Sequence, residues 1–230
     1  MSEPRSVAII DYGMGNLFNV ERALSRVGLA SRITGDPDIV RRAAGLILPG
    51  VGAFGDAMDN LKRLGLVEII KGGIARGLPF LGICLGMQLL MDESEEFGNH
   101  KGLGVLKGRV VKFPSSGPAG KIKVPQVGWN KISAPAGEHK AWQDTCLAGI
   151  VDGEHMYFVH SFYVEPIDET IVLSRTSYEG IDYCSAVGQG SVFACQFHPE
   201  RSADVGIKLY ANFAGLIHKP ACRQAGSDYG

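Results

Sequence analysis

The sequence has no excess of basic or acidic residues. It contains 23 Lys and Arg residues and 24 Asp and Glu residues, which gives a formal net charge of -1 at pH 7. Domains that bind nucleic acids usually carry a clear basic excess, so we expect no nucleic-acid partner. The sequence also lacks a signal peptide and an apolar run of about 18 residues, the length that indicates a membrane-spanning helix. These absences predict a cytoplasmic protein without a membrane role.

Cysteine is scarce as well, since the 230 residues include only five. An odd number without a Cys-x-x-Cys pair does not fit a disulfide framework or a zinc site, and is typical of a reducing compartment. We expect neither a metal nor another cofactor. Hydrophobic residues make up 45% of the chain and charged residues 20%, a globular composition. We expect one domain over residues 1–218 and a loose tail over residues 219–230.

Short apolar segments alternate with segments in which apolar residues recur at helical spacing. Strands are predicted at residues 7–10, 31–34, 45–49 and 79–83, and helices at residues 17–27, 56–64 and 66–76. This alternation favours an α/β fold with a doubly wound, mainly parallel sheet, which binds ligands at the carboxyl ends of its strands. Later segments predict an antiparallel addition at 109–113 and 128–132, strands at 156–163, 170–176, 183–187 and 192–197, and a helix at 203–217.

One cysteine lies at a predicted strand-to-helix turn. Cys84 is flanked by Gly82 and Gly86, which leave room for a sharp corner and for close packing of the following helix. A thiol at a helix N-terminus forms a thiolate more readily, so we interpret Cys84 as a nucleophile. Gln88, four residues further on, shares a helix face with the turn and can offer an amide to a ligand. The simpler interpretation is a buried structural cysteine.

A glycine-rich loop at residues 50–55 follows the third predicted strand. Acyl-transfer sites on parallel sheets often take one oxyanion donor from such a loop and one from the residue after the nucleophile. The candidate backbone N–H donors are those of Val51, Gly52 and Leu85. The alternative is a turn that only requires positive φ. We expect the loop at residues 11–16 to contact a ligand or a partner. A dinucleotide site is disfavoured, because the glycines of this loop lack the rest of the dinucleotide-binding fingerprint.

Two histidines are candidates for the base that serves Cys84. His198 ends a buried strand, and Pro199 biases it toward an extended backbone, so that Glu200 at i+2 can orient the ring. His160 ends another strand and is the rival. We favour His198 because only this histidine has a carboxylate two residues away. Glu96, in the acidic segment 92–96, either belongs to a solvated helix end or binds an ammonium group near the site.

Three motifs together resemble the class I, or triad, glutamine amidotransferase family over essentially the whole chain. They are the segment from Gly82 to Gln88, the glycine loop at 50–55, and the segment from Phe197 to Glu200. Within that family, segments 11–16, 123–130 and 160–163 resemble glutaminase subunits that pass ammonia to a (β/α)8 cyclase subunit.

The resemblance implies a role for each motif. Cys84 would attack the side-chain amide of glutamine, with His198 and Glu200 completing the triad. The residues implied to contact glutamine are Gly52, Gln88, Glu96, His160, Ser161 and Phe162. The residues implied to face the cyclase are Tyr12, Met14, Asn16, Lys123, Pro125, Trp129 and Arg201.

Two other interpretations stay open at the level of sequence. One is a cysteine hydrolase that acts alone on a small peptide or γ-glutamyl substrate, and the other is a non-catalytic binding protein with a redox-sensitive Cys84. Gln88 and the segment around Trp129 favour the partner-dependent glutaminase over the lone hydrolase. The complete Cys-His-Glu set favours an enzyme over a binding protein. A fold and a triad do not identify the substrate by themselves.

Overall fold

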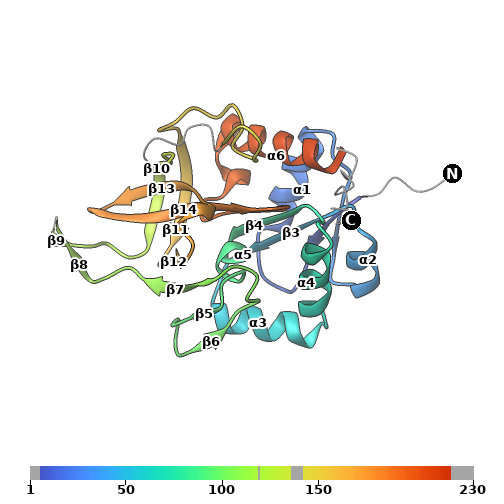
Figure 1. Cartoon of the computed structure of the whole chain (residues 1–230), viewed down its shortest axis with the longest axis horizontal. Helices are drawn as coiled ribbons and strands as arrows, with labels where there is room; N and C mark the ends of the chain where they lie inside the picture. The colour runs from blue at the N-terminus through green and yellow to red at the C-terminus, as the bar shows by residue number, and fades with distance from the viewer. Residues whose placement is uncertain (1–5, 119, 136–141, 219–230) are drawn as a thin grey trace, which may run out of the picture.

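A computed structural model describes residues 6–118, 120–135 and 142–218 (Figure 1). The tail predicted at 219–230 lies outside the described residues. In the part of the chain that the structure describes, no helix has both the length and the apolar character needed to cross a membrane.

A single large sheet forms the centre of the molecule. Its strands follow the order β2 (Ser31–Thr34), β1 (Val7–Ile10), β3 (Gly45–Gly50), β4 (Phe80–Cys84), β15 (Val192–Cys195), β14 (Ile181–Gln189), β12 (Phe162–Pro166), β7 (Gly108–Lys112), β5 (Glu93–Ser94) and β6 (His100–Lys101), with β13 (Val172–Tyr178) on β14. The first five strands in this order, β2, β1, β3, β4 and β15, are parallel. The strands β14, β13, β12 and β7 pair antiparallel. The predicted α/β fold with an antiparallel addition is confirmed.

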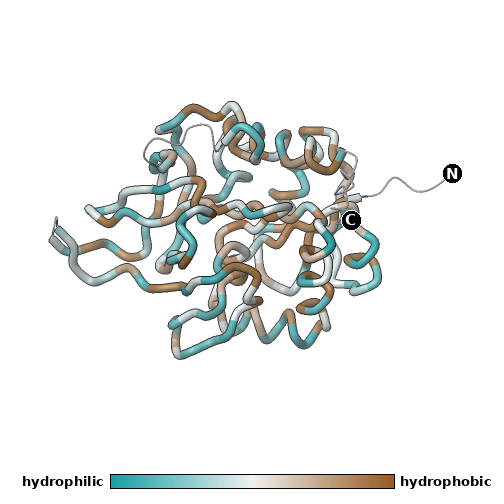
Figure 2. Tube along the Cα trace, viewed as in Figure 1, coloured by the Kyte–Doolittle hydropathy of each residue, from teal (hydrophilic) through white to brown (hydrophobic). Residues whose placement is uncertain are grey.

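Helices cover both faces of the parallel half. On one face lie α1 (Leu17–Arg26) and α6 (Ala203–His218), and on the other lie α2 (Pro37–Arg42), α3 (Phe54–Arg63) and α4 (Val67–Ala75) (Figure 1). Alternate strand residues feed two separate cores: Ile9 and Ile47 pack with Leu24 of α1, whereas Ala8 and Leu46 pack on the opposite side. Figure 2 shows this apolar interior as brown segments along the strands. Full burial of each large apolar side chain contributes about 1.5–3 kcal/mol to the free energy of unfolding.

The register of the parallel strands brings three loops to one edge. Gly50 at the end of β3 pairs with Cys84 at the end of β4, and Cys195 at the end of β15 pairs with Ile83 on the other side. The glycine loop and the segment that carries His198 therefore begin beside Cys84, although they lie far apart in the sequence.

Two elements differ from the prediction. The helix α2 was not predicted, although Asp36 accepts a hydrogen bond of 2.8 Å from the backbone N–H of Asp38 and Pro37 occupies the first turn, both ordinary start signals. The strand predicted at 156–163 is interrupted at Ser161. Its first part, β11 (His155–His160), pairs with β10 (Gln126–Lys131) in a separate two-stranded sheet, and only β12 joins the main sheet. A further small hairpin is formed by β8 (Ser116–Gly117) and β9 (Gly120–Lys121).

Candidate active site

Cys84 occupies a strained corner between β4 and the short helix α5 (Leu85–Gln88). Its φ of 53° and ψ of -107° lie in a region that side-chain-bearing residues rarely adopt. The neighbouring glycines make this corner possible. A Cβ on Gly86 would lie 1.7 Å from the carbonyl oxygen of Leu48, and one on Gly82 would lie 2.9 Å from that of Gly86. The close packing predicted from the glycine pair is confirmed.

The helix that follows Cys84 is short, since α5 has only 4 residues. Few aligned peptide dipoles therefore lie behind the sulfur. Polar side chains near Cys84 come from the segment that follows the strand β15.

His198 and Glu200 form a buried pair directly after β15. Nδ1 of His198 lies 2.8 Å from Oε1 of Glu200, and their side chains are 4% and 2% exposed. The predicted pair is present, and the backbone of His198 is extended as predicted, with φ of -105° and ψ of 93°. Residues Pro199–Arg201 then form a 3-10 turn, η3, so this turn, and not a continued extended segment, brings Glu200 to the ring. The turn is held by Ser202, whose hydroxyl donates a 2.7 Å hydrogen bond to the carbonyl of His198.

The charge state of His198 follows from its neighbours. Burial alone would lower the pKa of its imidazole, but the negative charge of Cys84, together with the charge of Glu200 and its hydrogen bond to the ring, outweighs burial and raises that pKa to about 10. Among the described residues the outer nitrogen, Nε2, is buried and has no hydrogen-bond partner. This arrangement favours a protonated imidazole next to Cys84, in the position that a Cys-His pair requires.

Gln196 is a site residue that was missed in the sequence. Its side-chain amide donates a 3.4 Å hydrogen bond to Sγ of Cys84, and its Oε1 accepts a 3.0 Å hydrogen bond from Gln88. Gln88 also donates a 2.9 Å hydrogen bond to the carbonyl of Phe162, so it acts on the sulfur through Gln196 and not directly. A signal was available, because Gln196 interrupts an otherwise apolar strand two residues before His198.

Most of the predicted catalytic, oxyanion and substrate residues line one cavity beside Cys84. This cavity has a volume of about 250 Å³. Its lining consists of Val51, Gly52, Cys84, Leu85, Gln88, Glu96, Pro125, Val159, His160, Ser161 and Phe162. His198 and Glu200 do not belong to this lining, and both side chains are buried. Contacts between the lining residues and substrate stay a prediction.

Two features of the lining bear on ligand binding. Gly52 has a φ of 117°, a conformation that glycine adopts without strain, and Val51 is 45% exposed. Oε2 of Glu96 accepts a 2.7 Å hydrogen bond from the backbone N–H of Phe54 at the start of α3. Partial burial raises the pKa of Glu96. Glu96 thus belongs to the cavity wall and not to a solvated helix end.

His160 is unsuited to the role of base. Its Nδ1 lies 2.8 Å from the carbonyl of Phe162 and its Nε2 lies 3.2 Å from the hydroxyl of Tyr183. Because a carbonyl only accepts, Nδ1 carries the proton. Burial lowers the pKa of His160 to about 4, so the ring is neutral near pH 7. Of the two candidates, His198 has the free nitrogen beside Cys84.

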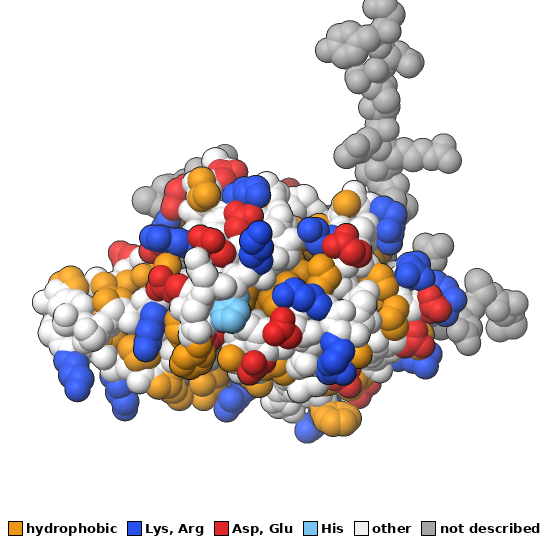
Figure 3. All heavy atoms as spheres, turned by 90° about the horizontal axis from the view of Figure 1, so that it is seen from below, with side chains coloured by type: hydrophobic (Ala, Val, Ile, Leu, Met, Phe, Trp, Pro, Cys, Tyr) orange, Lys and Arg blue, Asp and Glu red, His pale blue; other side chains and the backbone are white. Residues whose placement is uncertain are grey.

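The residues expected to face a partner differ in exposure. Asn16, Lys123, Pro125, Trp129 and Arg201 are exposed. Tyr12 is a correction, since its side chain is only 1% exposed and cannot lie on a contact surface. Arg201 stacks over the ring of Tyr157 at 4.2 Å, and Trp129 meets the same ring edge-on at 6.1 Å between centroids. The face in Figure 3 carries interspersed acidic and basic side chains.

Comparison with known proteins shows the family of this chain. The family model for class I glutamine amidotransferases matches residues 8–214. The chain belongs to the class I glutamine amidotransferase family. Solved structures show the same fold: the chain matches one of a glutamine amidotransferase with a TM-score of 0.68 at 19% identity, covering 91% of this chain and 98% of that one. It matches PurLQS from Thermotoga maritima with a TM-score of 0.69 at 22% identity, covering 93% and 99%.

Two curated relatives are much more similar in sequence. The imidazole glycerol phosphate synthase subunit HisH of Geobacillus kaustophilus is 49% identical over 211 residues, which cover 91% of this chain and 96% of the relative. The subunit of the same name from Syntrophotalea carbinolica is 47% identical over 214 residues, covering 91% and 100%.

Proposed function

We propose that this chain is the glutaminase subunit of an imidazole glycerol phosphate synthase in histidine biosynthesis, and that it works in the cytoplasm. The observation that carries the glutaminase chemistry is the buried pair of His198 and Glu200 behind Cys84, at the mouth of a cavity. The similarity to the HisH subunits supports the pathway.

The reaction begins at the sulfur. The Cys84 thiolate attacks the side-chain amide carbon of glutamine, and backbone N–H groups hold the resulting oxyanion. The proposed donors are those of Leu85 and of Val51 or Gly52, which line the same cavity as Cys84. Backbone donors suit this role because they are fixed by the fold before the charge develops.

The protonated His198 then acts as a general acid. It gives its proton to the departing nitrogen, because an amide ion is too poor a leaving group, and ammonia and a thioester result. Water, deprotonated by the same imidazole, attacks the thioester and releases glutamate. Glu200 keeps the ring oriented throughout and stabilises its charged form.

Binding of glutamine would use the rest of the cavity. The Glu96 carboxylate is suited to the α-ammonium group of the substrate, while Gln88, Gly52 and the segment His160–Phe162 enclose its remaining atoms. Glutamate, which is the product, would bind less well at the amide end because it brings a negative charge toward the thiolate.

The ammonia passes to a (β/α)8 cyclase subunit, which makes imidazole glycerol phosphate and an aminoimidazole carboxamide ribotide. The proposed contact surface consists of Met14, Asn16, Lys123, Pro125, Trp129 and Arg201. Free ammonia would be protonated in neutral water and lost as a nucleophile, so a joined subunit protects the product. We expect low glutaminase activity without the cyclase and strong activation on assembly.

The test measures glutamate released from glutamine by the chain alone, and by the chain with the cyclase subunit and its nucleotide ligand. The Cys84→Ala variant is the blank. Strong stimulation that disappears in the blank is the expected result. A high rate that the cyclase does not change would contradict partner control, and no glutamate under either condition would favour a hydrolase with another substrate.

A further inference from the structure

Glu200 has a second carboxylate oxygen that the triad does not use. Its Oε1 contacts His198, whereas Oε2 is buried and has no hydrogen-bond partner among the residues that the structure describes. A buried carboxylate oxygen without a donor is costly, and such groups are normally paired in folded proteins. We therefore expect a hydrogen-bond donor next to Oε2.

A donor without an acceptor lies on the neighbouring helix. Tyr210 of α6 is 0% exposed, and its hydroxyl is also buried without a partner in the described part of the chain. Tyr210 lies four residues after Gly206, so the two share a helix face. A Cβ on Gly206 would lie 1.8 Å from the carbonyl oxygen of Pro199, which means that this face of α6 touches the turn that carries Glu200.

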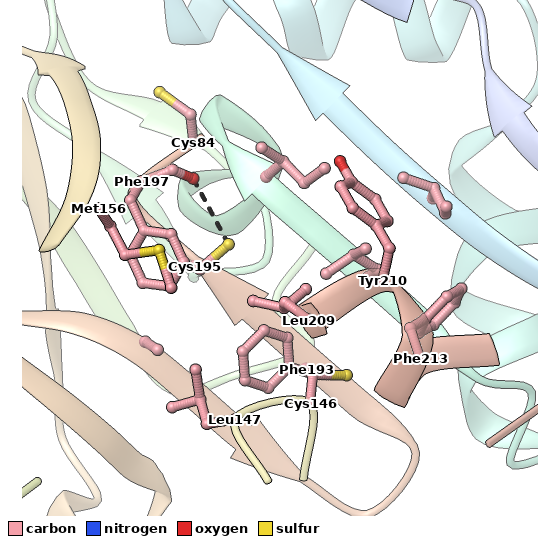
Figure 4. Packing of buried hydrophobic residues seen from close by; sticks show 14 of the residues in the cluster. Cys84, Cys146, Leu147, Met156, Phe193, Cys195, Phe197, Leu209, Tyr210 and Phe213 are labelled. Carbon is pink, nitrogen blue, oxygen red and sulfur yellow. Dashed lines mark hydrogen bonds between the residues drawn. The ribbon is translucent and has the colours of Figure 1, made fainter. Parts of the chain in front are cut away.

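The two side chains also affect each other electrostatically. Burial, and then the negative charge of Glu200, hold the pKa of the Tyr210 hydroxyl well above its usual range. The phenol therefore keeps its proton at any pH where the enzyme works. Figure 4 shows Tyr210 projecting from α6 among Leu209, Phe213 and the other core side chains, with its hydroxyl at the end toward the strands.

We propose that Tyr210 donates its hydroxyl proton to Oε2 of Glu200 and is a positioning residue of the triad. The bond fixes the carboxylate plane, so that Oε1 stays on Nδ1 of His198, and it supports the charged form of Glu200. The role in glutamine hydrolysis rests on the proposed function, whereas the effect on Cys84 reactivity does not.

The variant Tyr210→Phe tests this role with two readouts. Within the described residues, the titratable groups that face Glu200 are His198, Cys195 and Tyr210. Loss of a hydrogen bond to the charged carboxylate should lower kcat for glutamine about tenfold with little change in KM. The pH at which activity is lost on the acid side should rise by about one unit. The same shift is expected in the pH profile of Cys84 alkylation by iodoacetamide, measured in a Cys222→Ser background so that alkylation of Cys222 cannot contribute.

Two further variants separate positioning from packing. Ser174→Ala removes a buried hydroxyl that is hydrogen-bonded at 2.8 Å to Ser185; it should lower thermal stability and leave both pH profiles in place. In a Glu200→Gln background, Tyr210→Phe should not change the alkylation profile further. If Tyr210→Phe does not fold, NMR of labelled tyrosine Cζ atoms replaces it, and one resonance must move between wild type and Glu200→Gln. Unchanged profiles with equal or higher thermal stability, or no moving resonance, would overturn the proposal.

Discussion

The hydroxyl of Tyr12 donates a 3.0 Å hydrogen bond to the carbonyl of Pro49, and this bond joins the loop after β1 to the end of β3. The contact is close, since a Cβ on Gly50 would lie 2.2 Å from the same hydroxyl. On the outer side, a Cβ on Gly52 would lie 2.3 Å from Cε of Met14. The first loop therefore supports the strand end from which the proposed oxyanion donors follow.

Removal of the Tyr12 hydroxyl should weaken both stability and catalysis. Tyr12→Phe leaves the buried carbonyl of Pro49 without its donor, at a cost of about 1–2 kcal/mol in the free energy of unfolding. The glycine loop also loses a support, so kcat should fall while KM changes little. Urea unfolding and steady-state glutaminase rates measure the two effects. The control is Tyr178→Phe, whose exposed hydroxyl donates to Lys123 and whose loss should cost less than about 0.5 kcal/mol.

A methyl group at the corner after Cys84 should not be tolerated. Gly86→Ala places a Cβ 1.7 Å from the carbonyl oxygen of Leu48, and the strand cannot retreat without breaking its pairing. We expect a loss of about 3 kcal/mol or more, or no soluble folded protein. Thermal unfolding by circular dichroism measures the change.

The matched substitution is Gly215→Ala. Gly215 lies on an exposed position of α6, and an added Cβ meets nothing within 4 Å. Alanine there should raise stability by about 0.5–1 kcal/mol through its better helix propensity. If Gly86→Ala and Gly215→Ala changed the thermal stability equally, lack of space around Gly86 would not be the reason that alanine is excluded there.

Local patterns were enough to predict much of this fold and site. The run of apolar residues before Cys84 and its two flanking glycines predict a strand, a corner and a close approach, because each depends on residues near in sequence. The same holds for the parallel half of the sheet, where strands and helices alternate regularly. His198 and Glu200 could be paired because only two residues separate them.

Features that depend on distant contacts could not be predicted in this way. The break at Ser161 arises because β11 pairs with β10 whereas β12 pairs with β7 and β14, and strand propensity is the same on either side of the break. The burial of Tyr12 depends on Pro49, which lies 37 residues away. The contact between Gln196 and Cys84 could be predicted only with the knowledge that β15 lies next to β4.

The neutral state of His160 should make the protein sensitive to mild acid. Burial lowers its pKa from 6.5 to about 4, so the unfolded chain binds a proton that the folded chain does not between these values. The stabilisation is present above pH 6.5 and is lost as pH falls toward 4, by about 3 kcal/mol in total. Unfolding free energies of His160→Gln should lack this part of the pH dependence. The exposed His155→Gln should keep it, and identical curves for wild type and His160→Gln would contradict the prediction.

His198 should show the opposite dependence. Its pKa is raised from 6.5 to about 10, so its contribution to stability is complete below pH 6.5 and is lost as pH rises through 10. Cys84→Ala removes one of the two negative charges responsible, so the pKa of His198 should fall. Titration of the imidazole resonances by NMR follows it directly. A pKa that stays near 10 in Cys84→Ala would mean that Glu200 alone holds the proton.

The amide of Gln196 should stabilise the thiolate of Cys84. Gln196→Met keeps the length of the side chain but removes the donor that lies 3.4 Å from the sulfur. A hydrogen bond to a charged group contributes about 1.5–3 kcal/mol, so kcat and the rate of Cys84 alkylation near pH 7 should each fall about tenfold or more. Gln88→Met should lower the alkylation rate less, because Gln88 reaches the sulfur only through its 3.0 Å hydrogen bond to Gln196. Since both residues affect the sulfur through one amide, the double variant should be alkylated no more slowly than Gln196→Met alone. Fully additive losses in the alkylation rate would mean that Gln88 affects the sulfur independently of Gln196.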